Sequence, residues 1–237
     1  MTHNGTFRRL MYPALLAAAA FAPLPAGAGA QVEEQLAQSV VMGLSRSISD
    51  RPVPNNYSNR DDVRPWIREM SPRIAHKVAD ELERRDLLAT VYYESIRAGL
   101  DPQLVLAVIY HESGFKKFAF SSATARGYMQ VMPFWVKQIG TSDQNLFNLR
   151  TNLRYGTVIL RHYLDIESGD LYRALGRYNG SLGRPEYPNA VIAALNRYFL
   201  YTPVATTAVN AATAVNAATA VNAAAAVNTP AGVLTPR

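Results

Sequence analysis

The sequence contains no cysteine among its 237 residues. Disulfide bonds are therefore absent, and the folded state must rely on a hydrophobic core, for which 49% hydrophobic residues and 13 tyrosines are ample. A lipid anchor attached through a cysteine is excluded as well. The four histidines do not show the spacing of metal ligands. We therefore expect no metal site and no cofactor.

Long runs of one charge are also missing. The formal net charge is +6, from 24 basic and 18 acidic residues. The basic residues are scattered, and they form neither the stripe nor the sequence motif typical of proteins that bind nucleic acid. Nucleic acid is therefore a poor candidate partner. A mildly basic protein would instead be attracted to an anionic polymer such as cell-wall glycan or teichoic material.

No apolar run reaches the roughly 20 residues that are needed to span a bilayer. Residues 10–24 are mainly apolar but are interrupted by prolines, and Arg8 and Arg9 precede them. Small residues then lead to Ala30. This pattern is typical of a secretory signal peptide, residues 1–30, cleaved after Ala30. A membrane anchor is the weaker alternative. We expect a periplasmic or secreted protein with no stable membrane insertion after cleavage.

Composition divides the remaining chain into three parts. Residues 31–71 have an irregular pattern, with a short helix predicted over 32–44, and we interpret them as an N-terminal extension and linker. Residues 72–201 have the apolar periodicity of a helical domain. Residues 202–237 contain a repeated Thr-Ala-Val-Asn-Ala-Ala unit and are of low complexity. We expect a disordered tail there; an alanine-rich helix or a wall-contacting strand is the alternative.

Four helices are predicted around the centre of the helical domain. Ser71 is a candidate N-cap for an amphipathic helix over 72–88, with Ile74, Val78 and Leu82 on its apolar face. A second helix should end at Gly99. Further helices are expected over 171–178 and 188–201. The apolar faces of these helices should pack around the segment between the second and third of them.

That central segment predicts a buried helix from Pro102 to about Gly114. Asp101 is a good N-cap, and Pro102 suits the first helical position because its missing N–H has no partner there. Every residue from Leu104 to Ile109 is apolar, which indicates burial on most sides. Gly114 is a plausible stop.

Glu112 lies at the end of this apolar helix. Desolvation disfavours a carboxylate, and the partial negative charge at a helix C-terminus disfavours it further, so the pKa of Glu112 should be raised. A raised pKa is what a general acid near neutral pH requires. The alternative is a glutamate that is solvated or paired with Lys116 or Lys117.

Several short motifs follow one another downstream. They are Glu112-Ser113, Ser121, Gly127-Tyr128-Met129-Gln130-Val131-Met132-Pro133, the segment 152–157 and Tyr178-Asn179. In this order and spacing they resemble the catalytic domain of bacterial soluble lytic transglycosylases, relatives of goose-type lysozyme. The resemblance covers about 110 residues, from near Asp86 to near Arg197. It implies a mainly α, lysozyme-like fold.

The resemblance also implies roles for individual residues. Glu112 matches the sole catalytic acid/base of the family, and Ser121 matches a serine that forms a hydrogen bond at the active site. The remaining matches are substrate-binding positions: Gln130 and Met132 in the groove, and Tyr178 with Asn179 facing the catalytic glutamate. Simpler explanations exist for several of them. Ser121 could close a turn, Gln130 could cap a helix, and Tyr178-Asn179-Gly180 could form a turn.

The implied reaction is cleavage of the β-1,4 bond between N-acetylmuramic acid and N-acetylglucosamine in peptidoglycan, without water, to leave a 1,6-anhydro end. Glu112 would act first as acid and then as base. No second carboxylate lies in a matching motif, and in this family the acetamide of the substrate is thought to replace it. The alternatives are a hydrolytic goose-type lysozyme and a non-catalytic peptidoglycan-binding module. The partner is thus the glycan strand, and any envelope machinery is not identifiable.

The chain departs from the family pattern at three positions. Tyr128 replaces a common leucine, Arg177 replaces the alanine before Tyr-Asn, and Ile159 stands where many relatives have a tyrosine. Tyr155 and Tyr163 lie four residues on either side of Ile159 and would share its helical face. We hypothesise that one of them, with Tyr163 preferred, supplies the missing phenol at the substrate site.

Overall fold

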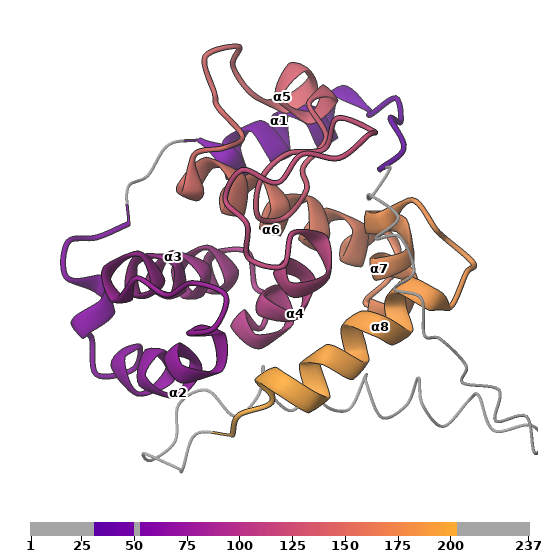
Figure 1. Ribbon diagram of the computed structural model, residues 1–237. Coiled ribbons are helices and arrows are strands. Elements are labelled where there is room, and N and C mark those ends of the chain that lie inside the picture. Colours follow the sequence, from indigo (N-terminus) through magenta and orange to yellow (C-terminus); the bar gives the residue numbers. More distant parts are fainter. Residues whose placement is uncertain (1–30, 50–52, 203–237) are drawn as a thin grey trace, which may run out of the picture.

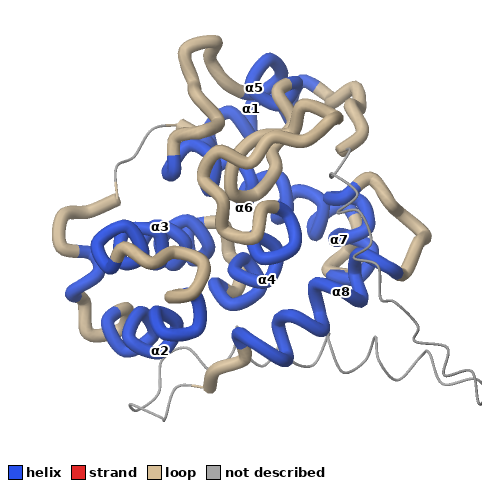
Figure 2. Tube along the Cα trace, viewed as in Figure 1, coloured by secondary structure: helices blue, strands red, loops and turns tan. Residues whose placement is uncertain are grey.

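The computed structural model describes residues 31–49 and 53–202 (Figure 1). The predicted signal peptide and nearly all of the predicted repeat tail lie outside these residues. The described part consists of helices and loops, with isolated β-bridges in one loop and no strands (Figure 2). The prediction of a mainly helical fold is therefore confirmed. No helix in these ranges is both long and apolar enough to cross a membrane.

Eight α-helices follow one another in the described residues, accompanied by two short helical turns. The α-helices are α1 (Gln38–Ile48), α2 (Arg64–Ile74), α3 (Glu81–Arg97), α4 (Pro102–Glu112), α5 (Phe134–Ile139), α6 (Leu149–Ile166), α7 (Leu171–Asn179) and α8 (Glu186–Ala194). The turns are η1 (Tyr57–Asn59), a 3₁₀-helix, and η2 (Leu195–Phe199), a π-helical continuation of α8.

Helix α4 lies in the middle of the bundle, with α3 on one side and α8 with η2 on the other (Figure 1). As predicted, the side chain of Asp101 caps its N-terminus, accepting a hydrogen bond of 2.8 Å from the backbone N–H of Gln103. Every side chain from Val105 to Ile109 is fully buried. Gly114 takes a left-handed conformation with φ +57°, which ends the helix where the sequence predicted.

The prediction of a single helix over 72–88 was wrong. Pro72 lies inside α2, and a loop over 75–80 separates this helix from α3. Asp80 begins α3 instead, because its carboxylate accepts a hydrogen bond of 2.7 Å from the N–H of Glu83. The apolar periodicity used for the prediction ran across the break, and Leu82, assigned to the buried face, is 78% exposed.

The part of the predicted extension that the structure describes belongs to the same core. The first helix begins six residues later than expected, at Gln38, and packs on α5 and α6. In α2, Trp66 and Met70 are buried with the side chains of the later helices. The expected boundary at residue 72 therefore falls within a helix that contributes to the core.

A buried ion pair joins α3 to α6. Arg154 donates two hydrogen bonds of 2.7 Å to the two carboxylate oxygens of Glu94, and both residues are at most 3% exposed. A third donor of Arg154 reaches the backbone carbonyl of Ser49 at 2.7 Å. The guanidinium thereby connects the end of α1 to the centre of the fold.

Loss of this arginine should be costly. We expect Arg154→Met to lower the free energy of unfolding by about 3–5 kcal/mol, because Glu94 would remain buried with only the longer contact of 3.6 Å to Arg97. Arg161→Met is the matched control on the same helix, since Arg161 pairs with the exposed Asp165 and such pairs contribute at most about 1 kcal/mol. Urea unfolding measures both values. Similar losses for the two variants would contradict the prediction.

Candidate active site

Glu112 is the last residue of α4 and is half-buried. One of its carboxylate oxygens accepts a hydrogen bond of 2.5 Å from the hydroxyl of Tyr187. Desolvation raises the pKa of Glu112 to about 8, and the hydrogen bond from Tyr187 opposes this rise. The direction is the one expected from the sequence. Within the described ranges, neither Lys116 nor Lys117 pairs with Glu112, which argues against the simpler alternative.

Tyr187 was not identified from the sequence. It lies in the first turn of α8, and the packing of α8 on α4 brings its hydroxyl to Glu112. Burial and the nearby Glu112 carboxylate raise the pKa of this phenol well above its usual value, so it remains a hydrogen-bond donor. No local pattern marks this tyrosine among the 13 in the chain. Only the packing of two helices far apart in sequence reveals it.

Tyr178 lies near the same carboxylate. It is fully buried, and its hydroxyl donates a hydrogen bond of 2.7 Å to the backbone carbonyl of Met129. Desolvation and then the Glu112 carboxylate raise the pKa of Tyr178 well above the usual value. Asn179 ends α7 half-buried, and Gly180 follows with φ +73°, so the sequence Tyr-Asn-Gly also serves as a helix stop.

The loop between α4 and α5 is fastened to α6 by a buried amide. Asn152 accepts a hydrogen bond of 2.8 Å from the N–H of Met129 and donates to the carbonyls of Arg126 and Leu146 at 2.7 and 2.8 Å. A Cβ at Gly127, whose φ is +73°, would lie 2.4 Å from the side-chain nitrogen of Asn152. The asparagine and the glycine are therefore required together.

A second close approach reinforces this attachment. A Cβ at Gly156 would lie 2.4 Å from the sulfur of Met129, and Met129 is fully buried. Met129 thus fills the core. Because its backbone carbonyl accepts the hydrogen bond from Tyr178, the packing on α6 also determines the position of Tyr178.

The three other polar or groove positions lie in or beside this loop. Ser121 accepts a hydrogen bond of 3.0 Å from the N–H of Ala125, so its hydroxyl closes a turn. Gln130 is buried, and its amide donates to the carbonyls of Gly127 and Ala119 at 2.9 and 3.2 Å. It therefore holds the loop together rather than capping a helix. Met132 is half-buried at the end of the loop. Contacts of these side chains with substrate stay a prediction.

The two α6 tyrosines on either side of Ile159 have different surroundings. The hydroxyl of Tyr155 bonds to Gln144, and Tyr163 is buried against Trp135, with ring centroids 6.1 Å apart. The phenol that contacts Glu112 is that of Tyr187 on α8. A substrate contact of Tyr163 stays a prediction.

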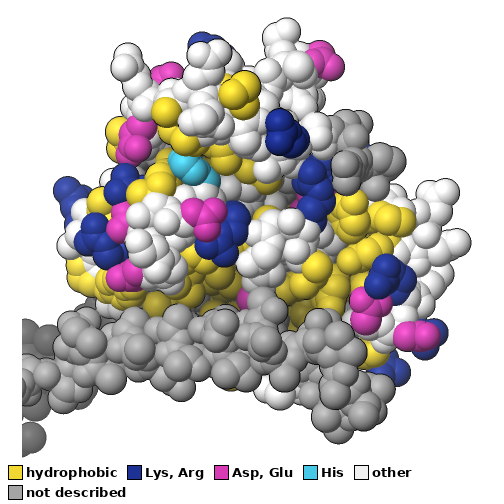
Figure 3. Space-filling model, turned by 180° about the vertical axis from the view of Figure 1, so that it is seen from behind, with side chains coloured by type: hydrophobic (Ala, Val, Ile, Leu, Met, Phe, Trp, Pro, Cys, Tyr) yellow, Lys and Arg dark blue, Asp and Glu magenta, His cyan; other side chains and the backbone are white. Residues whose placement is uncertain are grey.

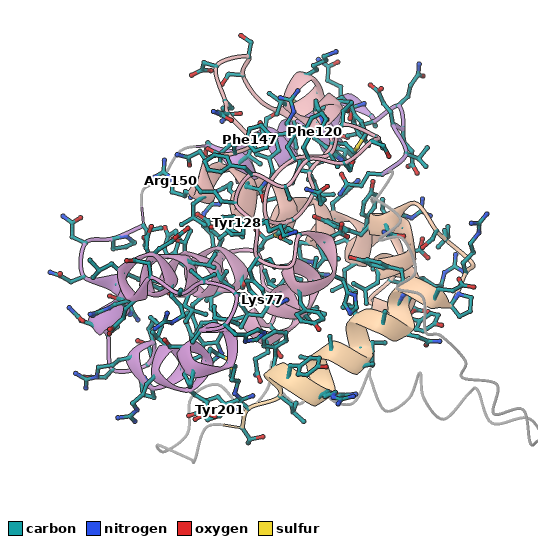
Figure 4. The ribbon with its side chains drawn as sticks, viewed as in Figure 1. Lys77, Phe120, Tyr128, Phe147, Arg150 and Tyr201 are labelled. Carbon is teal, nitrogen blue, oxygen red and sulfur yellow. The ribbon has the colours of Figure 1, made fainter. Side chains whose placement is uncertain are left out.

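Tyr128 lies near the middle of the molecule (Figure 4), with its hydroxyl beside Glu83 and Asp86 of α3. Burial and these carboxylates raise the pKa of Tyr128 to about 12. The extra phenol thus contacts α3.

The surface gives fewer clues than the buried contacts. Figure 3 shows acidic, basic and hydrophobic side chains mixed over one face. Two of the hollows in the described part are lined by residues of η1 with α3 and of α1 with α6, and Glu112 lines neither. Within those same ranges, no group of three or more histidine or acidic side chains could hold a metal ion. The chemistry of the site rests on the Glu112 contacts.

Residues 91–190 match the family model described as Transglycosylase SLT domain. The chain contains an SLT domain. The match extends from α3 to α8, and it includes Glu112, the loop fastened by Asn152, Tyr178 and Tyr187. The helical, lysozyme-like fold class expected from the sequence is therefore the correct one.

Two curated proteins share this region. The chain is 33% identical over 131 residues to "Transglycosylase" of Enterobacteria phage PRD1, which covers 52% of this chain and 48% of the relative. It is 37% identical over 93 residues to "Membrane-bound lytic murein transglycosylase F" of Desulfosudis oleivorans, covering 37% and 20%. The chain thus spans half or less of the length of these relatives. No solved structure matches it.

The raised pKa of Glu112 predicts how stability changes with pH. Between the usual value of 4.5 and about 8, the folded SLT domain keeps a proton on Glu112 that the unfolded chain has lost. This contribution to stability is complete below pH 4.5 and is lost as the pH rises to about 8.

Glu112→Gln should remove this dependence, since glutamine stays neutral. Urea unfolding at pH 5, 6.5 and 8 should show the variant gaining stability relative to the natural chain as pH rises, with about 1.4 kcal/mol for each unit of pKa shift. Other titrating groups are common to both proteins and cancel in the comparison. A difference that does not change with pH would refute the prediction.

Proposed function

We propose that the protein is an exported lytic transglycosylase that acts on peptidoglycan in the periplasm or outside the cell. It cleaves the β-1,4 bond between N-acetylmuramic acid and N-acetylglucosamine and leaves a 1,6-anhydro end. The observation that carries the proposal is Glu112, a carboxyl group with a pKa of about 8 that lies beside the Tyr187 hydroxyl within an SLT domain. At neutral pH this carboxyl group is protonated and able to act as an acid.

In the first step, Glu112 donates its proton to the glycosidic oxygen. The bond between this oxygen and C1 of the muramic acid breaks, and the oxygen leaves as a hydroxyl group of the departing sugar. Positive charge develops at C1 as the bond breaks. In the proposed mechanism the neighbouring acetamide of the substrate stabilises this charge.

The acidic side chains near the site support a mechanism with one carboxyl group. Glu167 pairs with Arg173 and Arg177, at 2.5 and 2.6 Å, and Asp170 caps α7. In the described part of the chain, no other carboxylate contributes to the pKa shift of Glu112. A second carboxylate of the kind that most glycosidases use is therefore not part of the proposal.

In the second step, the ionised Glu112 accepts the proton of the 6-hydroxyl group of the same muramic acid. The oxygen of that group bonds to C1 and closes the 1,6-anhydro ring, so no water is consumed. Glu112 regains its proton and is ready for another cycle. Tyr187 stabilises the intermediate ionised form, since its hydroxyl donates to the carboxylate. The neutral groups of Ser121, Gln130, Tyr178 and Asn179 suit the orientation of an acetamide and a sugar.

Product analysis tests this function. We expect mass spectrometry of fragments released from purified peptidoglycan to show 1,6-anhydromuramic acid ends, which are one water lighter than reducing ends. Glu112→Gln should reduce release by at least about 10²-fold, because it cannot donate a proton, while glycan binding persists. Reducing ends would identify a lysozyme instead. Binding without release by the natural chain would identify a binding module.

The hydrogen bond from Tyr187 predicts a shift in the pH profile. This bond lowers the pKa of Glu112, so Tyr187→Phe should raise that pKa further. Activity needs the protonated acid and is lost as pH rises through its pKa, so the alkaline limb of kcat/KM should move to higher pH. Tyr172→Phe is the matched control, since this hydroxyl bonds to Asn189 at 3.1 Å. The idea fails if both variants keep the natural limb.

A further inference from the structure

Residues 31–37, here named the strap, lie outside the matched SLT region and have no helical structure. They precede α1 and run from the region of α5 towards α7 (Figure 1). These two regions carry Met132 and Tyr178, which belong to the candidate active site. The strap therefore joins two parts of the site that are 46 residues apart (178 − 132) in the sequence.

Gln31 is the first attachment of the strap. It is only 4% exposed, although glutamine is usually a surface residue. Its side-chain oxygen accepts hydrogen bonds from the indole N–H of Trp135, at 3.0 Å, and from the backbone N–H of Met132, at 3.3 Å. The side-chain nitrogen of Gln31 is buried and has no hydrogen-bond partner among the described residues, and the proximity of Gln31 opposes the rise in the pKa of Tyr178. The amide thus lies among Met132, Trp135 and Tyr178.

Glu34 is the second attachment. Its carboxylate pairs with Arg177 at 3.0 Å, and its backbone carbonyl accepts a hydrogen bond of 3.0 Å from the side chain of Gln138. Glu167 holds the same guanidinium from the other side. Arg177 replaces the alanine that the family pattern has before Tyr-Asn. This departure is explained by the ion pair, which ties the strap to α7 beside Tyr178.

Between its two attachments the strap lies by an aromatic cluster. Trp135, His162 and Tyr163 have ring centroids within 6.3 Å of one another. Glu34 is close enough to raise the pKa of Tyr163, and Trp135 is only 2% exposed. Contacts on this cluster from Gln31 and Glu34 restrict how far the α5 and α7 regions can move apart.

We infer that the two attachments of the strap, Gln31 and Glu34, serve the active site and that Gln31 is a positioning residue, which fixes Met132 and Tyr178 relative to Glu112. The inference rests on the proposed function. Tyr178 bonds to the backbone of Met129, and Gln31, which lies close to Tyr178, bonds to the end of the same loop and to α5. Without the amide, two N–H groups lose their acceptor, and both regions become free to separate.

Kinetics on soluble, uncross-linked glycan strands test the inference in the full-length chain. We expect Gln31→Ala to lower kcat/KM about tenfold, the effect of one to two lost hydrogen bonds, mainly through a higher KM. The alkaline limb of the pH profile should not move, because Glu112 keeps its burial and its bond to Tyr187. Gln31→Glu retains an acceptor oxygen and should recover part of the loss.

Two further variants separate positioning from simple loss of stability. Glu34→Gln weakens the other attachment without altering Gln31 or the residue next to the predicted cleavage position, and it should raise KM about threefold. Glu33→Ala is the matched control in the same segment, since Glu33 is exposed and contacts only Gln138, at 3.5 Å, among the interactions of the described residues. It should keep natural kinetics.

Fluorescence provides a measurement that does not depend on activity. The chain has two tryptophans, and Trp66→Phe, a conservative change in the core, leaves Trp135 as the reporter. In this background Gln31→Ala should shift the emission of Trp135 to longer wavelength, while Glu33→Ala should not. Only Gln31→Ala removes the hydrogen-bond acceptor of the Trp135 indole and the side chain that shields it from water.

The outcomes distinguish the two proposals. If the natural chain releases no 1,6-anhydro fragments, the proposed function fails, and the fluorescence shift still reports whether the strap is docked. If the natural chain is active and Gln31→Ala shows the shift with unchanged KM, the strap is only structural and the inference is overturned. Loss of activity in proportion to unfolding, with natural KM in the folded fraction, would overturn it too.

Discussion

The desolvation of one carboxyl group is the constraint on which the rest of the site depends. Glu112 ends a helix whose five preceding core positions, Val105 to Ile109, are completely buried, so the side chain cannot be fully hydrated without unfolding α4. The cost of ionisation raises its pKa, and the Tyr187 hydroxyl limits the rise. In the proposed mechanism this group both gives and takes a proton. The two phenols near it, Tyr178 and Tyr187, stay neutral because burial raises their pKa values.

The geometry around that group depends on buried polar contacts between distant segments. Asn152 attaches the loop after α4 to α6, and Gly127 and Gly156 leave space for this close approach. The backbone carbonyl of Met129 in this loop then accepts the hydrogen bond that positions Tyr178. These contacts give a physical reason for the order of the sequence motifs. Gly127 leaves space for Asn152, and Gly156 leaves space for Met129. Asn152 supplies both a donor and an acceptor, so a larger residue at either glycine would displace the side chain packed against it.

Local signals were sufficient for α4, because Asp101, Pro102, Gly114 and a continuous apolar run each act within one helix. They failed at the junction of α2 and α3, where apolar periodicity crossed a loop and placed Leu82 on a buried face that does not exist. They could not reveal Tyr187, Gln31 or the pairing of Glu94 with Arg154, since each acts through partners 60 or more positions away in the sequence. The resemblance indicated Glu112 as the candidate acid, and tertiary packing alone specifies which phenol contacts it.

These long separations also constrain the order of folding. Glu112 and Tyr187 are 75 positions apart, Gln31 and Trp135 104, and Glu34 and Arg177 143. Contacts that close such long loops form late, because their entropic cost is met only after much of the core has assembled. A growing or partly threaded chain therefore has the acid but lacks the surroundings that tune it. Under the proposed function, a chain that has not yet packed α8 on α4 lacks the contact that tunes its acid.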